Sequence, residues 1–265
     1  MPVNFLSEAE RLRFNSFPSD LSGEDLIGFF TLSRTDLLQI PANASTANRL
    51  GFALQLVLLR FLGFHLSELS SVPSAIIDFA ASQIEVESDQ FSFYGEREQT
   101  RSDHQRQIEK YLGYRSATQD DLKFVTEWLT MRSLEHDRPI LLLQLLCEHL
   151  QSERIVRPGL TILAKIVGAA RERAEQEIYR MLTPLLDEFQ TQELNKLLKP
   201  SEPNRLSPLV WLRNSATSNT PQTILEALIK FNRLQQWKVG EWDLSFLNPN
   251  RRKQLAQIGF RSTAQ

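Results

Sequence analysis

Apolar residues recur along the chain at intervals of three and four positions, and alternating runs of β-branched residues are nearly absent. This spacing places apolar side chains on one face of a helix and lacks the two-residue period of a strand. Proline and glycine stand mostly where a helix is expected to stop. The sequence therefore predicts an all-α, multi-helical fold made of many helices of short to medium length.

The first 115 residues are expected to form one helical domain. Its central helix, over residues 46–62, is apolar nearly all round, so neighbouring helices should enclose it. Ser33 is expected to cap the short helix before it, because Asp36 stands at the capping-box position. Gly113 is a natural end for the last helix of this domain. The helices expected here cover residues 7–14, 23–30, 34–40, 46–62, 73–84 and 91–112.

Residues 116–265 are expected to form a second helical domain. Thr118 and Asp121 predict a further helix cap, and Pro184 marks a kink or boundary inside a long helical stretch. The segment 200–220 is rich in Pro, Ser, Asn and Thr, and it is expected to be a loop or hinge. The helices expected here cover residues 119–133, 139–149, 160–189, 221–234 and 249–258.

The composition is typical of a soluble globular protein, with 42% hydrophobic and 23% charged residues in a chain of 265. No segment approaches 18 uncharged apolar residues, and the first residues lack the pattern of a secretory signal. The single cysteine, Cys147, cannot form an internal disulfide, and its leucine-rich surroundings predict a buried position. A cytoplasmic protein without a membrane partner is expected.

The net charge of −2 conceals an uneven distribution along the chain. Residues 1–115 hold 10 Lys and Arg against 15 Asp and Glu, whereas residues 201–265 hold 9 against 4. A basic C-terminal part is compatible with contact to a polyanion, and it is equally compatible with an ordinary solvated surface. The acidic first domain is unlike a DNA clamp.

No catalytic or cofactor motif stands out in the sequence. The four histidines are scattered without the spacing of a metal site, and no phosphate-binding or nucleophile-elbow glycine motif occurs. Paired acidic residues fit the first turns of helices, where negative charge is favourable. We therefore expect no catalytic residue, no metal and no cofactor.

The helix expected over residues 91–112 carries a cationic stripe. At 100° per residue, Arg97, Arg101 and His104 fall on one face, and Thr100 stands beside them. Arginine and threonine on one face can bind phosphate oxygens or read base edges, so the stripe is a candidate DNA contact. The alternative is a solvated face whose charges form local ion pairs.

Polar residues also open the apolar helix over residues 46–62. Asn48 and Arg49 stand in its first turn, and helix N-termini donate to phosphates. Alternatively, Arg49 and Arg60 form structural ion pairs with nearby acidic residues. The helices over residues 24–62 are compatible with a helix-turn-helix-like unit, a pattern shared by many helical domains.

Several strings of residues spread over essentially the whole chain carry a family resemblance. They are Phe-Thr-Leu-Ser at 30–33, Asn-Arg-Leu-Gly-Phe-Ala-Leu-Gln-Leu at 48–56, Leu-Leu-Arg at 58–60, Val-Pro at 72–73, Arg-Glu-Gln-Thr-Arg at 97–101 with His104, Leu-Gly-Tyr-Arg at 112–115, Pro-Gly-Leu-Thr-Ile-Leu at 158–163, Ala-Arg-Glu-Arg-Ala-Glu at 170–175 and Pro-Asn-Arg-Arg-Lys-Gln-Leu-Ala-Gln-Ile-Gly at 249–259. With these strings the chain resembles the N-terminal region of the transposases of Tn-three-type replicative transposons.

The resemblance implies a role in binding double-stranded DNA at the terminal inverted repeats of a transposon. Transposases of this family bind those repeats through N-terminal helical domains, and an RNase H-like domain with three metal-binding carboxylates cuts and joins the strands. The resemblance covers only the region before that catalytic domain. It implies recognition of transposon ends without enzymatic activity, in a fragment or in a short derivative that competes with the full enzyme.

The resemblance also selects candidate DNA contacts. They are Asn48, Arg49, Arg97, Thr100, Arg101, His104, Arg115, Arg171, Arg173, Arg251, Arg252 and Lys253. Arg171 and Arg173 stand about 200° apart around a helix, so at most one of them is expected to face a given groove. The alternative function is that of a helical scaffold or regulator whose partner is a full-length transposase or a second copy of the chain.

Overall fold

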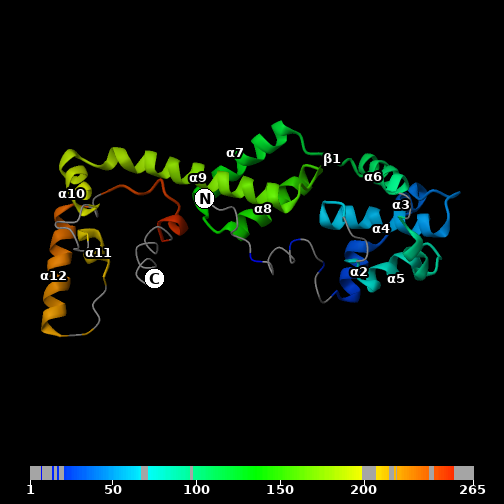
Figure 1. The fold of residues 1–265 in the computed structure, drawn as a ribbon, viewed down its shortest axis with the longest axis horizontal. Helices are drawn as coiled ribbons and strands as arrows, with labels where there is room; N and C mark the ends of the chain where they lie inside the picture. Colours follow the sequence, from blue (N-terminus) through cyan, green and yellow to red (C-terminus); the bar gives the residue numbers. More distant parts are fainter. Residues whose placement is uncertain are drawn as a thin grey trace. The chain divides into compact units, whose positions relative to one another are not determined.

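A computed structural model of the chain describes residues 7, 14, 17, 21–66, 71–95, 98–198, 207–214, 218, 220–238 and 242–253 (Figure 1). Its elements confirm the all-α fold class. The α-helices are α2 (Gly23–Phe30), α3 (Arg34–Gln39), α4 (Thr46–Leu62), α5 (Ser74–Gln83), α6 (Glu98–Leu112), α7 (Gln119–Glu135), α8 (Pro139–Ser152), α9 (Leu160–Leu182), α10 (Glu188–Leu198), α11 (Pro208–Arg213) and α12 (Pro221–Gln236). In the described part of the chain, the 3-10 helices η2 (Ser88–Phe93) and η3 (Thr183–Leu185) lie between them.

The helix ends follow the local signals in the sequence. Ser33 caps α3 in a capping box with Asp36, as predicted. Thr118 and Asp121 form the same reciprocal bonds before α7. Gly113 follows α6 with a φ of 75°, the left-handed conformation that glycine adopts at little cost. The helix expected over residues 249–258 is confirmed over 249–253, and its remaining residues lie outside the described part of the chain, as do residues 8–13 of the helix expected over 7–14.

Two segments differ from the prediction. The helix expected over residues 91–112 is divided into η2 and α6, and Gly95 between them has a φ of 89°, which no helix accommodates. The stretch 200–220, expected to be irregular, contains the short helix α11. Ser207 caps α11 and Pro208 occupies its first position, two helix-starting signals that the composition of the stretch concealed.

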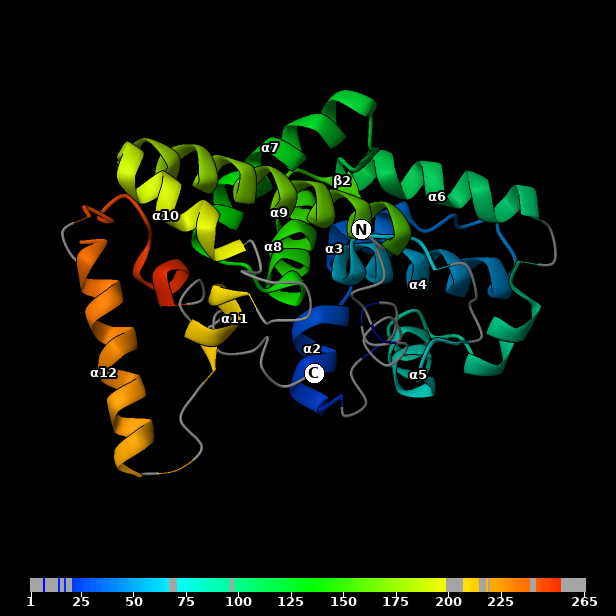
Figure 2. The same cartoon turned by 60° about the vertical axis from the view of Figure 1, so that its left-hand side comes forward.

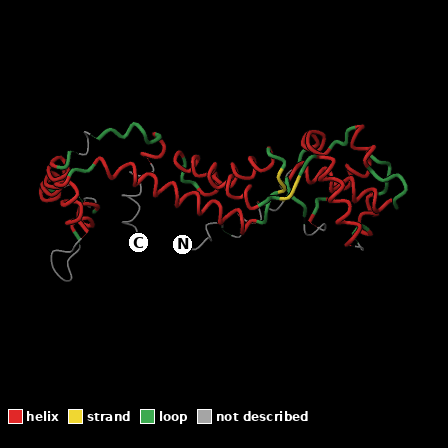
Figure 3. Tube along the Cα trace, turned by 90° about the horizontal axis from the view of Figure 1, so that it is seen from above, coloured by secondary structure: helices red, strands yellow, loops and turns green. Residues whose placement is uncertain are grey.

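The chain divides into two compact units. The first holds Met1–Glu127 and Pro139–Gly168, and the second holds Trp128–Arg138 and Ala169–Gln265. The expected domain boundary after residue 115 falls inside the first unit. There the strand β1 (Arg115–Ser116) pairs in parallel with β2 (Ile155–Val156), a pairing too short to leave a periodic signal in the sequence (Figure 3).

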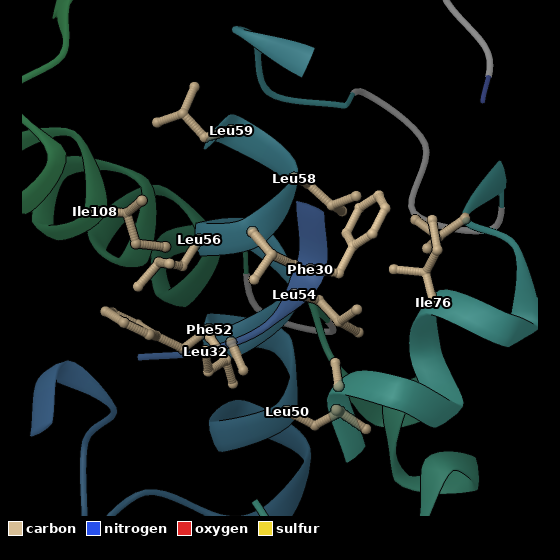
Figure 4. Packing of buried hydrophobic residues seen from close by; sticks show 14 of the residues in the cluster. Phe30, Leu32, Leu50, Phe52, Leu54, Leu56, Leu58, Leu59, Ile76 and Ile108 are labelled. Atoms are coloured by element: carbon tan, nitrogen blue, oxygen red, sulfur yellow. The ribbon is translucent and has the colours of Figure 1, made fainter. Parts of the chain in front are cut away.

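Helix α4 forms the core of the first unit, as its uniformly apolar sequence predicted. Most of its residues between Ala47 and Leu59 are buried. Their side chains meet Phe30 of α2, Ile76 of α5 and Ile108 of α6 (Figure 4). Because α4 is enclosed on nearly all sides, it cannot serve as the exposed recognition helix of a helix-turn-helix unit.

Candidate nucleic-acid interface

The face of α6 that carries the predicted cationic stripe turns toward the core of the first unit. His104 is only 6% exposed, and its Nδ1 lies 3.0 Å from the hydroxyl of Tyr94. Gln55 of α4 donates from Nε2 to the same hydroxyl at 2.6 Å, so the tyrosine O–H is left to donate to His104. Burial lowers the pKa of His104, which keeps the ring neutral at pH 7. A neutral buried ring cannot contact DNA directly, so an exposed stripe that includes His104 is not formed.

The other members of the stripe are also turned inward or not described. Arg101 is half-buried, and its Nη2 donates to the backbone carbonyl of Leu66. Thr100 is half-buried one position before it. Arg97 lies outside the described residues. The outward face of α6 instead carries an ion pair between Arg106 and Asp103 at 3.3 Å.

The residues of the first turn of α4 are held partly inside the protein. Asn48 and Arg49 are both half-buried, and the backbone N–H of Asn48 donates to the capping Ser45 at 3.3 Å. The Nε of Arg49 is buried without a hydrogen-bond partner among the described residues. Arg60 forms the structural ion pair that was the alternative for these arginines, with Asp36 at 2.7 Å.

Arg115 is exposed, but a carboxylate occupies its guanidinium. Its Nη2 lies 2.7 Å from Oδ1 of Asp121, and Nη1 binds the second oxygen of the same group. Hydrogen bonds from Arg115 and then from Thr118 hold the pKa of Asp121 well below its usual range. Asp121 therefore serves both as the cap of α7 and as the partner of Arg115, which leaves less of that arginine for a phosphate.

In the second unit one carboxylate binds two of the candidate arginines. Asp137 follows α7, and its Oδ1 accepts a hydrogen bond from Nε of Arg171 in α9 at 2.8 Å. Its Oδ2 lies 3.0 Å from Nη1 of Arg251, a residue that is only 3% exposed. Asp137 thus ties the start of the C-terminal basic segment to α9. No sequence pattern indicated this role, because the partners of Asp137 are distant in the chain.

Three candidate cations that neighbour these two arginines in the sequence are exposed to solvent. Arg173 is exposed two positions beyond Arg171, as expected from their separation around the helix. Arg252 and Lys253 are exposed directly after Arg251, in the helical segment 249–253, where the N–H of Arg252 donates to the carbonyl of Asn248 at 3.0 Å. Each of the three stands within two residues of an arginine that Asp137 fixes. The positive charges of these three residues are therefore accessible to a polyanion, and the backbone that carries them is ordered.

The described part of the chain holds neither a metal-binding cluster nor a membrane span. No group of three or more His, Cys, Asp or Glu side chains among the described residues could hold a metal ion. None of the described helices is both long and apolar enough to cross a membrane. Cys147 is half-buried, and burial raises the pKa of its thiol.

Comparison with known proteins places the chain in a family. It belongs to the family of a domain of unknown function, DUF4158, which matches residues 5–170. It is 30% identical over 258 residues to the transposase for transposon Tn501 of Pseudomonas aeruginosa. It is 28% identical over 260 residues to the transposase for transposon Tn1546 of Enterococcus faecium. Both alignments cover 97% of this chain and 26% of the relative.

A third relative is the transposase for transposon Tn21 of Escherichia coli, which is 32% identical over 237 residues. The chain spans about a quarter of the length of the transposases it matches, and the matched quarter is their N-terminal part. The resemblance to the N-terminal region of Tn-three-family transposases is therefore confirmed.

Proposed function

We propose that this chain binds double-stranded DNA at the terminal inverted repeats of a transposon. It would act as the end-recognition part of a transposase, or as a short derivative that regulates transposition by occupying those ends. The similarity to the N-terminal quarter of transposases supports this assignment, because recognition of the element's ends is a task that strand transfer requires.

The observation that carries the proposal is the exposure of three candidate cations that neighbour Arg171 and Arg251 in the sequence. Arg173, Arg252 and Lys253 are exposed, whereas Arg171 and Arg251 are bound to the carboxylate of Asp137, and the charge of Arg252 also contributes to lowering the pKa of Asp243. In this proposal the two bound arginines position the backbone and the three exposed cations contact phosphates. A prepositioned cation loses less side-chain entropy on binding than one on a free tail.

In this proposal the other candidate residues have a smaller part in contacting DNA. Asn48, Arg49, Thr100 and Arg101 are half-buried and His104 is buried, so in this proposal they position the first unit and make no primary contact with phosphates. Arg115 is expected to add little to DNA affinity, because its Nη1 and Nη2 already donate to the carboxylate of Asp121.

The test is a fluorescence-anisotropy titration at two salt concentrations. The duplexes carry the inverted-repeat end of the transposon that encodes the chain, or a scrambled sequence. The variant combines Arg173→Ala, Arg252→Ala and Lys253→Ala. Where one of these cations neutralises a phosphate in the complex, its removal should make the slope of log K against log salt concentration shallower by about 0.9.

A matched control removes the same charge from cations that pair with carboxylates. It combines Lys123→Ala, Arg180→Ala and Lys196→Ala, whose partners are Asp120, Glu177 and Glu193 respectively. The control should bind the repeat nearly as tightly as the unmodified chain. Equal affinity for repeat and scrambled duplex would refute end recognition, and equally weakened binding in both variants would refute the assignment of the contact to Arg173, Arg252 and Lys253.

A further inference from the structure

Arg251 is the buried member of a run of three basic residues. Arg251, Arg252 and Lys253 follow one another in the helical segment 249–253, which is drawn in red in Figure 2. Arg251 is 3% exposed, whereas Arg252 and Lys253 are exposed. A guanidinium buried to this extent cannot reach a phosphate, so its charge has to be balanced inside the protein.

Asp137 supplies a counter-charge to Arg251 and joins it to α9. Its Oδ2 lies 3.0 Å from Nη1 of Arg251, and its Oδ1 accepts a hydrogen bond from Nε of Arg171 at 2.8 Å. Arg251 also acts on a second residue of α9. The hydrogen bond to Glu175 raises the pKa of Tyr179, and the charge of Arg251 opposes that rise. Arg251 therefore faces α9, and Asp137 holds it there.

The helical turn of this segment is formed by local bonds. Oδ1 of Asn248 accepts from the N–H of Asn250 at 2.9 Å, and Pro249 occupies the first helical position. The carbonyl of Asn248 accepts from the N–H of Arg252 at 3.0 Å, and Leu247 is buried just before the turn. Loss of the Asp137 carboxylate would thus leave the turn formed but able to rotate, which would bring Arg251 into water.

We propose that Asp137 is a positioning residue for DNA binding, which holds Arg251 inward and thereby directs Arg252 and Lys253 toward phosphates. This inference rests on the proposed function. At 100° per residue, Arg252 and Lys253 stand 100° and 200° from Arg251, so fixing the inward residue fixes the direction of both. Charge alone predicts the opposite effect, because a carboxylate near DNA repels phosphates and its removal would strengthen binding. The two accounts therefore differ in the sign of the change in affinity.

The experiment measures binding of the full chain to the repeat and scrambled duplexes by fluorescence anisotropy over a series of salt concentrations. Asp137→Asn keeps the size of the side chain and removes its charge. Its DNA affinity should fall about tenfold, because two long side chains must then be ordered on binding. The slope of log K against log salt concentration should become shallower by up to about 1.8, from about 0.9 for each of Arg252 and Lys253. A fall in affinity at an unchanged slope would overturn the proposal.

The matched control is Asp243→Asn, which removes an exposed carboxylate near the same segment. Hydrogen bonds from Ser245 and then the charge of Arg252 lower the pKa of Asp243, so this carboxylate competes with a phosphate for Arg252. Its removal should leave the DNA affinity unchanged or raise it. Asp137→Glu should retain most of the affinity, because it keeps the negative charge beside Arg251.

A double variant separates positioning from a loss of fold. Asp137→Asn with Arg251→Met replaces the buried ion pair by neutral side chains. It should bind DNA more tightly than Asp137→Asn alone, although it carries one positive charge fewer. A double variant as weak as the single one would overturn the proposal, and so would an Asp137→Asn variant that binds as tightly as the unmodified chain or more tightly.

Failure of the proposed function gives a different result. Equal affinity of the unmodified chain for the two duplexes would refute end recognition, and the effect of Asp137→Asn would then be measured on the scrambled duplex. An unmodified chain that binds neither duplex would overturn both proposals.

Discussion

The guanidinium of Arg60 lies 2.7 Å from the carboxylate of Asp36, and the side chain of Asp36 is 1% exposed. Asp36 is also the capping-box residue of α3, and the hydroxyl of Tyr111 in α6 donates to it at 2.9 Å. One carboxylate therefore caps a helix locally and joins α3, α4 and α6. The capping role follows from the sequence, whereas the second role requires three segments to meet.

Replacing Asp36 should destabilise the first unit far more than replacing an ordinary helix cap does. Asp36→Ala removes the partner of a half-buried arginine, and the expected decrease is about 3 kcal/mol in the free energy of unfolding. The measurement is urea denaturation followed by circular dichroism. Asp25→Ala is the matched control, because Asp25 forms the same capping box in α2 but, among the described residues, is joined only to Ser22. Similar decreases in the two variants would contradict the tertiary role of Asp36.

Two glycine-to-alanine substitutions should have opposite effects on stability. A Cβ added at Gly51 in α4 would stand 2.2 Å from the ring of Tyr94, so Gly51→Ala should cost about 3 kcal/mol by overpacking. Gly28→Ala in α2 meets nothing within 4 Å and should stabilise the chain by about 0.5–1 kcal/mol. Thermal unfolding of both variants gives the comparison. A neutral or stabilising Gly51→Ala would show that Tyr94 does not lie against α4.

The buried His104 should make stability depend on pH. Burial lowers the pKa of His104 in the folded chain. As pH falls below about 6.5, the unfolded chain therefore binds a proton at this histidine while the folded chain does not. Stability should fall with decreasing pH through this range, with a contribution of up to about 1.4 kcal/mol per pH unit. The measurement compares the unfolding free energy from pH 7 to pH 5 in the unmodified chain and in His104→Gln. The variant should show the shallower dependence, and identical slopes would contradict burial of the neutral ring.

Removing Asp137 should loosen the second unit. In Asp137→Ala the buried Arg251 loses a carboxylate partner, and breaking a buried ion pair by removing one partner costs about 3–5 kcal/mol. Amide hydrogen exchange should increase in the helical segment 249–253 and in α9 around Arg171. Asp120→Ala serves as the control, because that carboxylate is 92% exposed and its ion pair with Lys123 adds little. Unchanged exchange protection in Asp137→Ala would show that Asp137 does not hold residues 249–253 to α9.

Local sequence signals predicted most helices of the fold. Caps at Ser33 and Thr118 and the glycine at 113 mark helix ends, because each acts on backbone groups within a few residues. The break at Gly95 was missed, since a glycine inside a polar helical pattern does not reveal its φ. The two-residue strands were also missed, because their pairing partners are separated by a long stretch of chain.

The sequence by itself determined the helical class, the enclosed helix α4 and the resemblance to transposases, all of which depend on periodicity or on strings of neighbouring residues. Only the tertiary structure decided which charges are available. It turned His104 inward against Phe52 and paired Arg171 and Arg251 with Asp137, while Arg173, Arg252 and Lys253 stayed exposed. The physical reason is that periodicity places a side chain on a face of its helix, whereas burial and ion pairing depend on which distant segments pack against that face.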